Sequence, residues 1–207
     1  MKYDINIMIA RLKEAYPLAL CELDADQPYR LLIATRLSAQ CTDRRVNMVT
    51  PALFEAFPTL EAFAAAEPDD IEPYIRSCGL SKTKSRDIVF MCRQIIENYD
   101  GKLSDTVEEL VKLSGVGRKT ANLIVGDVYG KPAVVADTHV IRITNLLGLC
   151  NKKDPLTVEN TLRVLLPPEE SNDFCHRIVL HGRAVCVAGR PACDKCILSD
   201  MCKSAKR

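Results

Sequence analysis

The chain has 207 residues, 47% of them hydrophobic, which is enough to bury a sizeable core and predicts a compact protein of one or two small domains. Residues 1–17 interrupt their apolar positions with charged ones, so they lack the hydrophobic run of a signal peptide, and no stretch is long enough to span a bilayer. The net charge of +1 excludes attraction of the whole molecule to polyanions, so any nucleic-acid binding must come from local patches.

Caps, apolar residues at helical spacing and glycine stops predict helices separated by short turns, with no convincing strand alternation. An N-terminal helix is expected first. The further helices expected are, in chain order: one after Thr42 and Asp43; one from Asp69 that stops at Gly79; Ser81 to Tyr99; a brief one through Lys112, with a capping box of Asp105 and Glu108; Lys119 to Tyr129; Thr138 to Leu147; and two that start near Thr157 and Ser171. The predicted fold class is therefore all-α.

Four of the ten cysteines gather near the C-terminus, where Cys186, Cys193, Cys196 and Cys202 have the spacing C-x6-C-x2-C-x5-C. A tight cysteine cluster in a chain without a secretory signal indicates metal ligation. Zinc sites usually present two closely spaced ligand pairs, whereas this segment has one, so the spacing favours a [4Fe-4S] cluster with one thiolate for each iron. Zinc or two disulfides remain the alternatives at this point.

The other six cysteines stand singly among apolar residues, and we expect them to be buried thiols: Cys21, Cys41, Cys78, Cys92, Cys150 and Cys175. No paired metal-ligand spacing and no evident activating base accompanies them.

A second informative segment is LSGVGRKTA, residues 113–121, which lies between two predicted helices. Gly115 and Gly117 allow a tight hairpin whose backbone can approach a partner closely. Amide groups in that turn, together with the positive end of the following helix, can hold a phosphate oxygen. A contact of this kind positions a nucleic-acid backbone without reading its sequence. Taken alone, a glycine-rich connection between helices is more often only a turn.

Several motifs together resemble the endonuclease III family of the helix-hairpin-helix DNA glycosylase superfamily. They are LSGVGRKTAN, VVADTHVIR, LSAQCTD at residues 37–43, the turn at Gly79 and Leu80, HGR at 181–183 and the four-cysteine spacing. The resemblance extends through almost the whole chain. It implies a base excision repair enzyme that acts as both a DNA glycosylase and an AP lyase.

The resemblance implies catalytic roles for Lys119 and Asp137. Lys119 would attack C1′ of the damaged nucleoside as a neutral amine, release the base and leave a Schiff base that permits β-elimination of the 3′ phosphate. Asp137 would stabilise positive charge on the sugar and assist proton transfers. Asp137 followed by Thr138 also has the pattern of a helix N-cap, and both roles can hold together.

Base excision from a duplex requires the target nucleotide to be extruded, and by resemblance Gln40 and Leu80 fill the space that it leaves. Backbone contacts to DNA are expected from Gly115, Val116 and Gly117, and phosphate contacts from Lys82, Lys84, Arg118, Arg183, Arg190 and Lys195. His139 and His181 are expected to have structural roles only. Ser114 stands where the family commonly has proline, which is expected to loosen the hairpin slightly.

The resemblance implies two helical domains that flank a DNA-binding cleft. We expect one domain at residues 22–132, with the hairpin, and another formed by residues 1–21 together with 133–207, with a structural [4Fe-4S] cluster in its C-terminal loop. The expected partner is double-stranded DNA with damaged bases or abasic sites. We further expect a cytoplasmic monomer with no membrane contact, which would be associated with the nucleoid if the source is bacterial.

Two other functions remain open on the sequence. A monofunctional glycosylase specific for mismatched thymine or adenine would share the cluster and the aspartate, although Lys119 counts against it. A non-catalytic DNA-binding iron-sulfur module would not require Lys119 or Asp137. Within the implied function, oxidised pyrimidines are the expected substrates.

Overall fold

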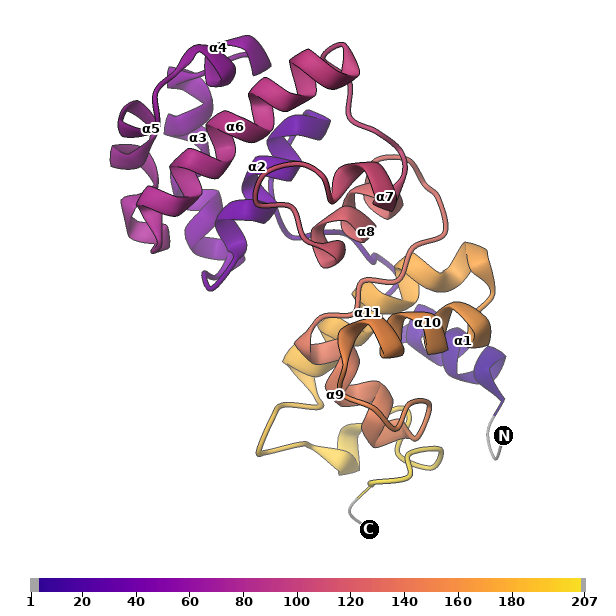
Figure 1. Cartoon of the computed structure of the whole chain (residues 1–207). Coiled ribbons are helices and arrows are strands. Elements are labelled where there is room, and N and C mark those ends of the chain that lie inside the picture. The colour runs from indigo at the N-terminus through magenta and orange to yellow at the C-terminus, as the bar shows by residue number, and fades with distance from the viewer. Residues whose placement is uncertain (1–3, 206–207) are drawn as a thin grey trace. The chain divides into compact units, whose positions relative to one another are not determined.

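The computed structural model describes residues 4–205, and within that range every regular element is a helix (Figure 1). This confirms the all-α prediction. The chain divides into two compact units, one formed by residues 21–129 and the other by residues up to 20 together with those from 130 onward. No helix in the described range is both long and apolar enough to cross a membrane.

The first unit, residues 21–129, contains the long helix α6, against which α4 and α5 pack. Its core is apolar, with Phe63, Ile71 and Ile88 fully buried. Its elements are α2 (Pro28–Ser38), α3 (Asp43–Ala56), α4 (Leu60–Ala65), α5 (Pro68–Ile75), η1 (Arg76–Cys78), α6 (Ser81–Tyr99), α7 (Val107–Leu110) and α8 (Arg118–Asp127).

The second unit joins the N-terminal helix to the C-terminal part of the chain, and α11 packs against both α1 and α9. Met8, Leu12, Phe174 and Ile178 are among its buried residues. Its elements are α1 (Ile5–Ala15), α9 (Thr138–Leu147), α10 (Pro155–Leu165), η2 (Pro168–Glu170), α11 (Ser171–Ala184) and η3 (Cys193–Lys195). The pairing of α1 with α11 brings together chain segments about 160 residues apart.

Local signals placed most helices correctly. α6 and α9 have the predicted bounds, and Gly148 ends α9 in the left-handed conformation with φ of 82°. The capping box expected of Asp105 and Glu108 is wrong, because α7 begins one residue after Thr106 and has no side-chain cap. α2 and α4 were not predicted from the sequence. α2 has no side-chain cap that would indicate its start, although proline at its first position favours a helix start.

Candidate functional site

The glycine hairpin of residues 113–117 joins α7 to α8 within the first unit. The amide of Val116 donates to the carbonyl of Leu113 at 3.1 Å, and Gly115 has φ of 72°. A hydrogen bond across four residues, with a left-handed glycine third, is the pattern of a type II turn. Gly115 and Gly117 are exposed, whereas Val116 is buried. The hairpin therefore offers the backbone of its two glycines to solvent and anchors itself through the side chain of Val116.

Two cations occupy the first two positions of α8. Arg118 and Lys119 follow the N-cap Gly117 directly, and both are exposed. The start of a helix carries a partial positive charge, so cations are unfavourable there and anions are favoured. A helix start that nevertheless carries two cations beside exposed glycine backbone is suited to a polyanionic partner. The structure thus places Lys119 next to the hairpin, as the sequence predicted.

Gln40 and Leu80 both have left-handed backbone conformations, with φ of 57° and 51°. This region is uncommon for residues other than glycine, and such outliers often mark functional sites. Leu80 is 54% exposed, although burial of a leucine side chain is favourable. Each residue ends a short turn, Gln40 after α2 and Leu80 before α6. Both turns present a strained residue at the surface of the first unit.

Lys84 connects the chain segments that precede these two turns. Its Nζ donates to the carbonyl of Leu37 at 2.7 Å and to that of Cys78 at 2.9 Å. The residue is fully buried, and burial lowers the pKa of its ammonium group. The predicted phosphate contact of Lys84 is therefore wrong, because its charge is enclosed and bonded to backbone carbonyls. Lys84 is a structural tie between the end of α2 and the turn at Gly79.

Replacing Lys84 with methionine should lower the free energy of unfolding by about 2–3 kcal/mol, because two buried carbonyls lose their donor. Lys82→Met, two residues earlier at an exposed position, is the matched control and should have little effect. Since the pKa of Lys84 is lowered in the folded protein, the unfolded chain binds more protons just below pH 10.5. The stability of the wild type relative to Lys84→Met should then rise with pH in that window. Chemical denaturation across pH measures both effects, and equal stability of the two variants at every pH would contradict the tie.

The other predicted phosphate contacts lie at the surface. Lys82 is exposed near the start of α6, and Arg183, Arg190 and Lys195 are exposed along the C-terminal segment.

Two of the single cysteines differ from the prediction, since Cys21 and Cys41 are only partly buried. Burial, and the adjacent thiol of Cys41, raise the pKa of Cys78 to about 11.

Asp137 is the N-cap of α9 in the second unit. Its Oδ1 accepts a hydrogen bond from the amide of Val140 at 2.7 Å, so the side chain is the N-cap that its sequence pattern suggested. The carboxylate is partly exposed. This cap fixes the direction of the carboxylate and leaves its second oxygen available to other partners.

The four clustered cysteines line one cavity of about 150 Å³ in the second unit. The rest of the wall is mainly apolar, from Leu146, Val185, Pro191 and Ala192. None of the ten cysteines forms a disulfide in the structure, and the four clustered ones are partly buried. No three His, Cys, Asp or Glu side chains in residues 4–205 converge closely enough to hold a single metal ion.

Two polar side chains lie close to sulfur atoms of this cysteine cavity. Arg142 Nη1 donates to Cys186 Sγ at 3.6 Å, and His181 Nε2 lies 3.3 Å from Cys196 Sγ. The other ring nitrogen of His181 is 3.0 Å from the hydroxyl of Tyr16. Burial is the main cause that lowers the pKa of His181, and the positive charge of Arg142 lowers it further. Neither Arg142 nor Tyr16 was predicted from the sequence, although Arg142 lies within the motif that contains Asp137.

Gly182 explains part of the HGR motif. A side chain at this position would begin 2.8 Å from His139 Nδ1 and 2.8 Å from Ile143 Cδ1. Real Cβ atoms do not approach other atoms this closely, so only glycine lets α11 lie this near α9. The close packing places α9, which begins after Asp137, against the helix that precedes the cysteine cavity.

Comparison with known proteins gives consistent matches. Residues 33–168 match the family model described as HhH-GPD superfamily base excision DNA repair protein. Endonuclease III of Synechocystis sp. is 45% identical over 94% of this chain and 90% of its own length. A solved structure of a trapped endonuclease III–DNA covalent intermediate superimposes with a TM-score of 0.93 and 41% identity, covering 99% of this chain and 97% of that one.

A thermostable thymine-DNA glycosylase shares the fold, with a TM-score of 0.85 over 97% of this chain and 95% of that one, but only 20% identity. At that identity the likeness concerns the fold alone. The matches at 41% and 45% identity are both to endonuclease III and extend over nearly the full length. The chain therefore belongs to the endonuclease III family of the HhH-GPD superfamily, base excision repair enzymes that are DNA glycosylases and AP lyases.

Proposed function

We propose that this protein removes oxidised pyrimidines from duplex DNA, with Lys119 as the nucleophile and Asp137 as the assisting carboxylate. The observation that carries the proposal is the position of Lys119, exposed at the second residue of α8 directly after the glycine hairpin. A related protein with 41% identity has been trapped as a covalent intermediate with DNA. A lysine beside a phosphate-binding turn is suited to form such an intermediate.

The proposed reaction begins with attack of the neutral Lys119 amine on C1′ of the damaged nucleoside. The bond from C1′ to the base breaks and the base leaves with a proton. The C1′–O4′ bond of the sugar ring then opens, O4′ takes up a proton, and nitrogen and C1′ remain joined as a protonated imine. The imine acidifies the C2′ proton, whose removal breaks the bond from C3′ to the phosphate oxygen. Asp137 would stabilise the cationic sugar and carry protons in these steps.

The hairpin would hold the DNA backbone near the lesion. Exposed glycine amides and the positive start of α8 favour an anion, and neighbouring Arg118 adds a salt-sensitive contact. Leu80 and Gln40 are suited to fill the space of an extruded nucleotide, because their left-handed backbones are already strained and Leu80 is exposed. Lys82, Arg183, Arg190 and Lys195 would supply further phosphate contacts.

The mismatch-specific alternative differs in its chemistry. A monofunctional glycosylase uses water to displace the base and leaves no covalent bond to the enzyme, so it has no need of an exposed amine after the hairpin. Lys119 favours the bifunctional reaction, and so does the identity of 41% and 45% to endonuclease III against 20% to the thymine-DNA glycosylase. The preference for oxidised pyrimidines over a mismatched thymine is the part that the substrate experiment decides.

Borohydride trapping tests the reaction and its substrate together. The purified protein is mixed with duplexes that carry thymine glycol, an abasic site, a mismatched thymine or no lesion, and borohydride reduces any imine to a stable adduct. We expect adducts with thymine glycol and with the abasic site. An adduct with the abasic site alone would refute the proposed base preference, and no adduct with either would refute the lysine mechanism.

We also propose that Cys186, Cys193, Cys196 and Cys202 hold a [4Fe-4S] cluster. A single zinc ion with Zn–S bonds of about 2.3 Å would hold its sulfurs roughly 4 Å apart. No three of these four thiols form a site for one metal ion in the described part of the chain, yet all four line one largely apolar cavity. A cubane has its irons at separate corners and so suits such a donor set. Bound there, the cluster would cross-link residues 186–202, which have little regular structure.

Cys193→Ala should lose nearly all bound iron, because each thiolate would hold one corner of the cluster. Cys150→Ala is the matched control, since Cys150 is buried in the same unit but does not line the cavity. Iron and acid-labile sulfide analysis of anaerobically purified proteins gives the result. Wild type and Cys150→Ala should contain the same amount of iron, and in each of them the amount of sulfide should equal the amount of iron. Zinc without sulfide in the wild type would overturn the cluster assignment.

A further inference from the structure

A polar network fastens the hairpin to the body of the first unit. Ser114 is the second residue of the type II turn, and its amide donates to Gln94 Oε1 at 2.7 Å. Its hydroxyl lies 3.3 Å from Asp87 Oδ1. Asp87 and Gln94 are seven residues apart on α6, which is two turns, so they share one face of the helix. That face receives the hairpin.

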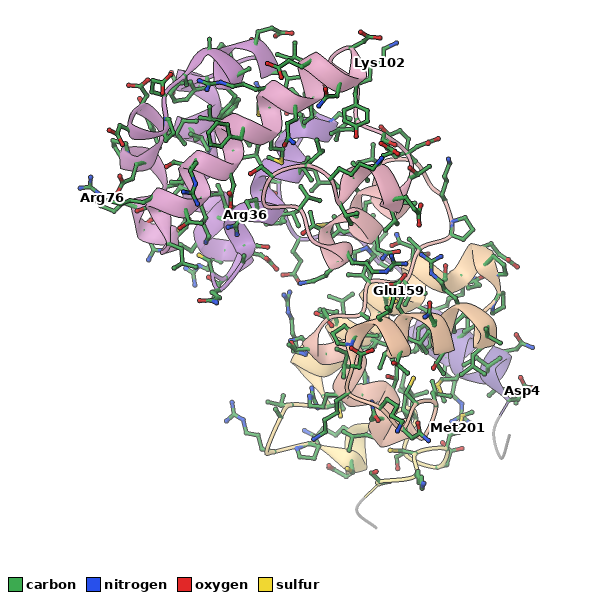
Figure 2. All side chains as sticks on the ribbon, in the orientation of Figure 1. Asp4, Arg36, Arg76, Lys102, Glu159 and Met201 are labelled. Carbon is green, nitrogen blue, oxygen red and sulfur yellow. The ribbon has the colours of Figure 1, made fainter. Side chains whose placement is uncertain are left out.

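An ion pair lies directly under the turn. Arg36 of α2, which is labelled in Figure 2, donates from Nε and Nη2 to Asp87 Oδ2 at 2.9 and 2.6 Å. Both side chains are less than 15% exposed. A Cβ on Gly115 would lie 2.7 Å from Arg36 Nε and 2.8 Å from Asp87 Oδ2. The backbone of Gly115 thus rests on the ion pair. Asp87 joins α2, α6 and the hairpin in one contact.

This arrangement corrects the expectation that Ser114 loosens the hairpin. A type II turn leaves the amide of its second residue outside the turn's own hydrogen bond, and proline is favoured there because it lacks that amide. In this chain the amide is present, and Gln94 accepts its hydrogen bond. Gln94 Nε2 in turn lies 3.4 Å from the carbonyl of Lys112, just before the turn. The side chain of Gln94 thus bonds to the backbone of Lys112 and to that of Ser114, the residues on either side of Leu113 where the turn begins.

We propose that Gln94 and Asp87 are positioning residues for DNA binding. They fix the conformation of the hairpin, so that its glycine backbone is presented to a DNA phosphate and the start of α8, which carries Lys119, has a defined position. The inference rests on the proposed role of the hairpin in holding the DNA backbone. A preorganised loop binds more tightly because less ordering is needed when the ligand arrives. Neither residue needs to touch DNA for this effect.

The test is a double-mutant cycle on the hydrogen bond between Gln94 and Ser114. Gln94→Leu leaves the Ser114 amide without its acceptor, and should raise the Kd for a duplex with a stable abasic-site analogue about tenfold. Ser114→Pro removes the amide itself at a position where proline suits the turn. The double variant Gln94→Leu/Ser114→Pro should therefore recover most of the affinity that Gln94→Leu loses.

The salt dependence separates positioning from direct charge contacts. Gln94→Leu removes no charge, so the slope of log Kd against log salt should match that of the wild type, whereas Lys82→Gln should reduce the slope by about 1. Melting temperatures measured alongside confirm that the variants are folded during the binding assay.

The inference would be overturned if folded Gln94→Leu bound the duplex with wild-type affinity. It would also be overturned if Gln94→Leu and the double variant lost the same affinity relative to the wild type. Should Gln94→Leu fail to fold, Ser114→Pro and the double variant still test it, because without the Ser114 amide the loss of Gln94 should cost little and the two variants should have similar Kd values. A Kd of the double variant about tenfold above that of Ser114→Pro would then overturn the inference. Failure of the proposed function has a different signature. In that case the wild type itself forms no borohydride adduct with an abasic duplex, whatever the hairpin variants do.

Discussion

Lys119→Gln should abolish the borohydride-trapped adduct and slow base release by roughly 10^4- to 10^6-fold, the range seen when a catalytic nucleophile or its partner is removed. Glutamine is nearly as long as lysine and keeps a polar end, so the start of α8 should remain intact. It has no amine that can form an imine with C1′. Lys119 is exposed, so its replacement should leave the free energy of unfolding within about 0.5 kcal/mol of the wild type.

The matched control is Arg118→Gln, which removes one charge from the neighbouring position of the same helix. Both variants should lose a similar, modest part of the affinity for undamaged duplex, because each loses one cation beside the hairpin. Only Lys119→Gln should lose the adduct. Single-turnover kinetics and trapping on a thymine glycol duplex give the comparison. An adduct of wild-type yield with Lys119→Gln would mean that another amine is the nucleophile.

Local sequence signals accounted for most of the helices and for the hairpin. α9 was placed correctly because its start and its end are both encoded nearby, in the Asp137 cap and in Gly148. The type II turn follows from Gly115, which adopts a φ that other residues rarely accept. The position of Lys119 at the second residue of α8 follows from its place directly after that turn. Features of this kind depend on residues within one or two helical turns.

Features that depend on distant residues were not predictable in the same way. Lys84 has the sequence context of a solvent-exposed lysine, and its burial depends on the carbonyl of Leu37, 47 residues earlier. The contact of Arg142 with Cys186 spans 44 residues. The bond from Ser114 to Gln94 reverses the expected effect of Ser114. In each case a polar group is satisfied by a partner that only the folded chain brings near.

The capping box shows a different limit. Asp105 and Glu108 have the spacing of a box, yet the helix begins at Val107 after Thr106. Val107 and Leu110 are buried, and burial of these two side chains sets where the short helix lies. Packing therefore overrides the local capping preference in a helix of four residues. The longer helices have enough turns for both signals to agree.

Asp137→Asn separates the two roles of this aspartate, because asparagine caps a helix about as well as aspartate does but carries no charge. The amide oxygen can still accept the hydrogen bond from Val140 N that Oδ1 accepts in the wild type at 2.7 Å. We therefore expect the free energy of unfolding to change by less than about 0.5 kcal/mol. Base release should nevertheless slow by roughly 10²- to 10⁴-fold, the usual contribution of a general acid or base. Asp137→Ala should lose the same rate and, in addition, about 1 kcal/mol of stability.

Asp154 provides the control, since it caps α10 in the same unit by accepting from Thr157 N at 2.8 Å. Asp154→Asn removes the same charge from the same structural position of another helix and should leave the rate unchanged. Urea denaturation and single-turnover excision of thymine glycol, run on the wild type and the three variants, decide between the roles. If Asp137→Asn excised the base at nearly the wild-type rate, the aspartate would be a helix cap alone, and the charge that stabilises the sugar would have to come from another group. If the rate falls while stability holds, the cap serves the chemistry, because the hydrogen bond that starts α9 also aims the carboxylate.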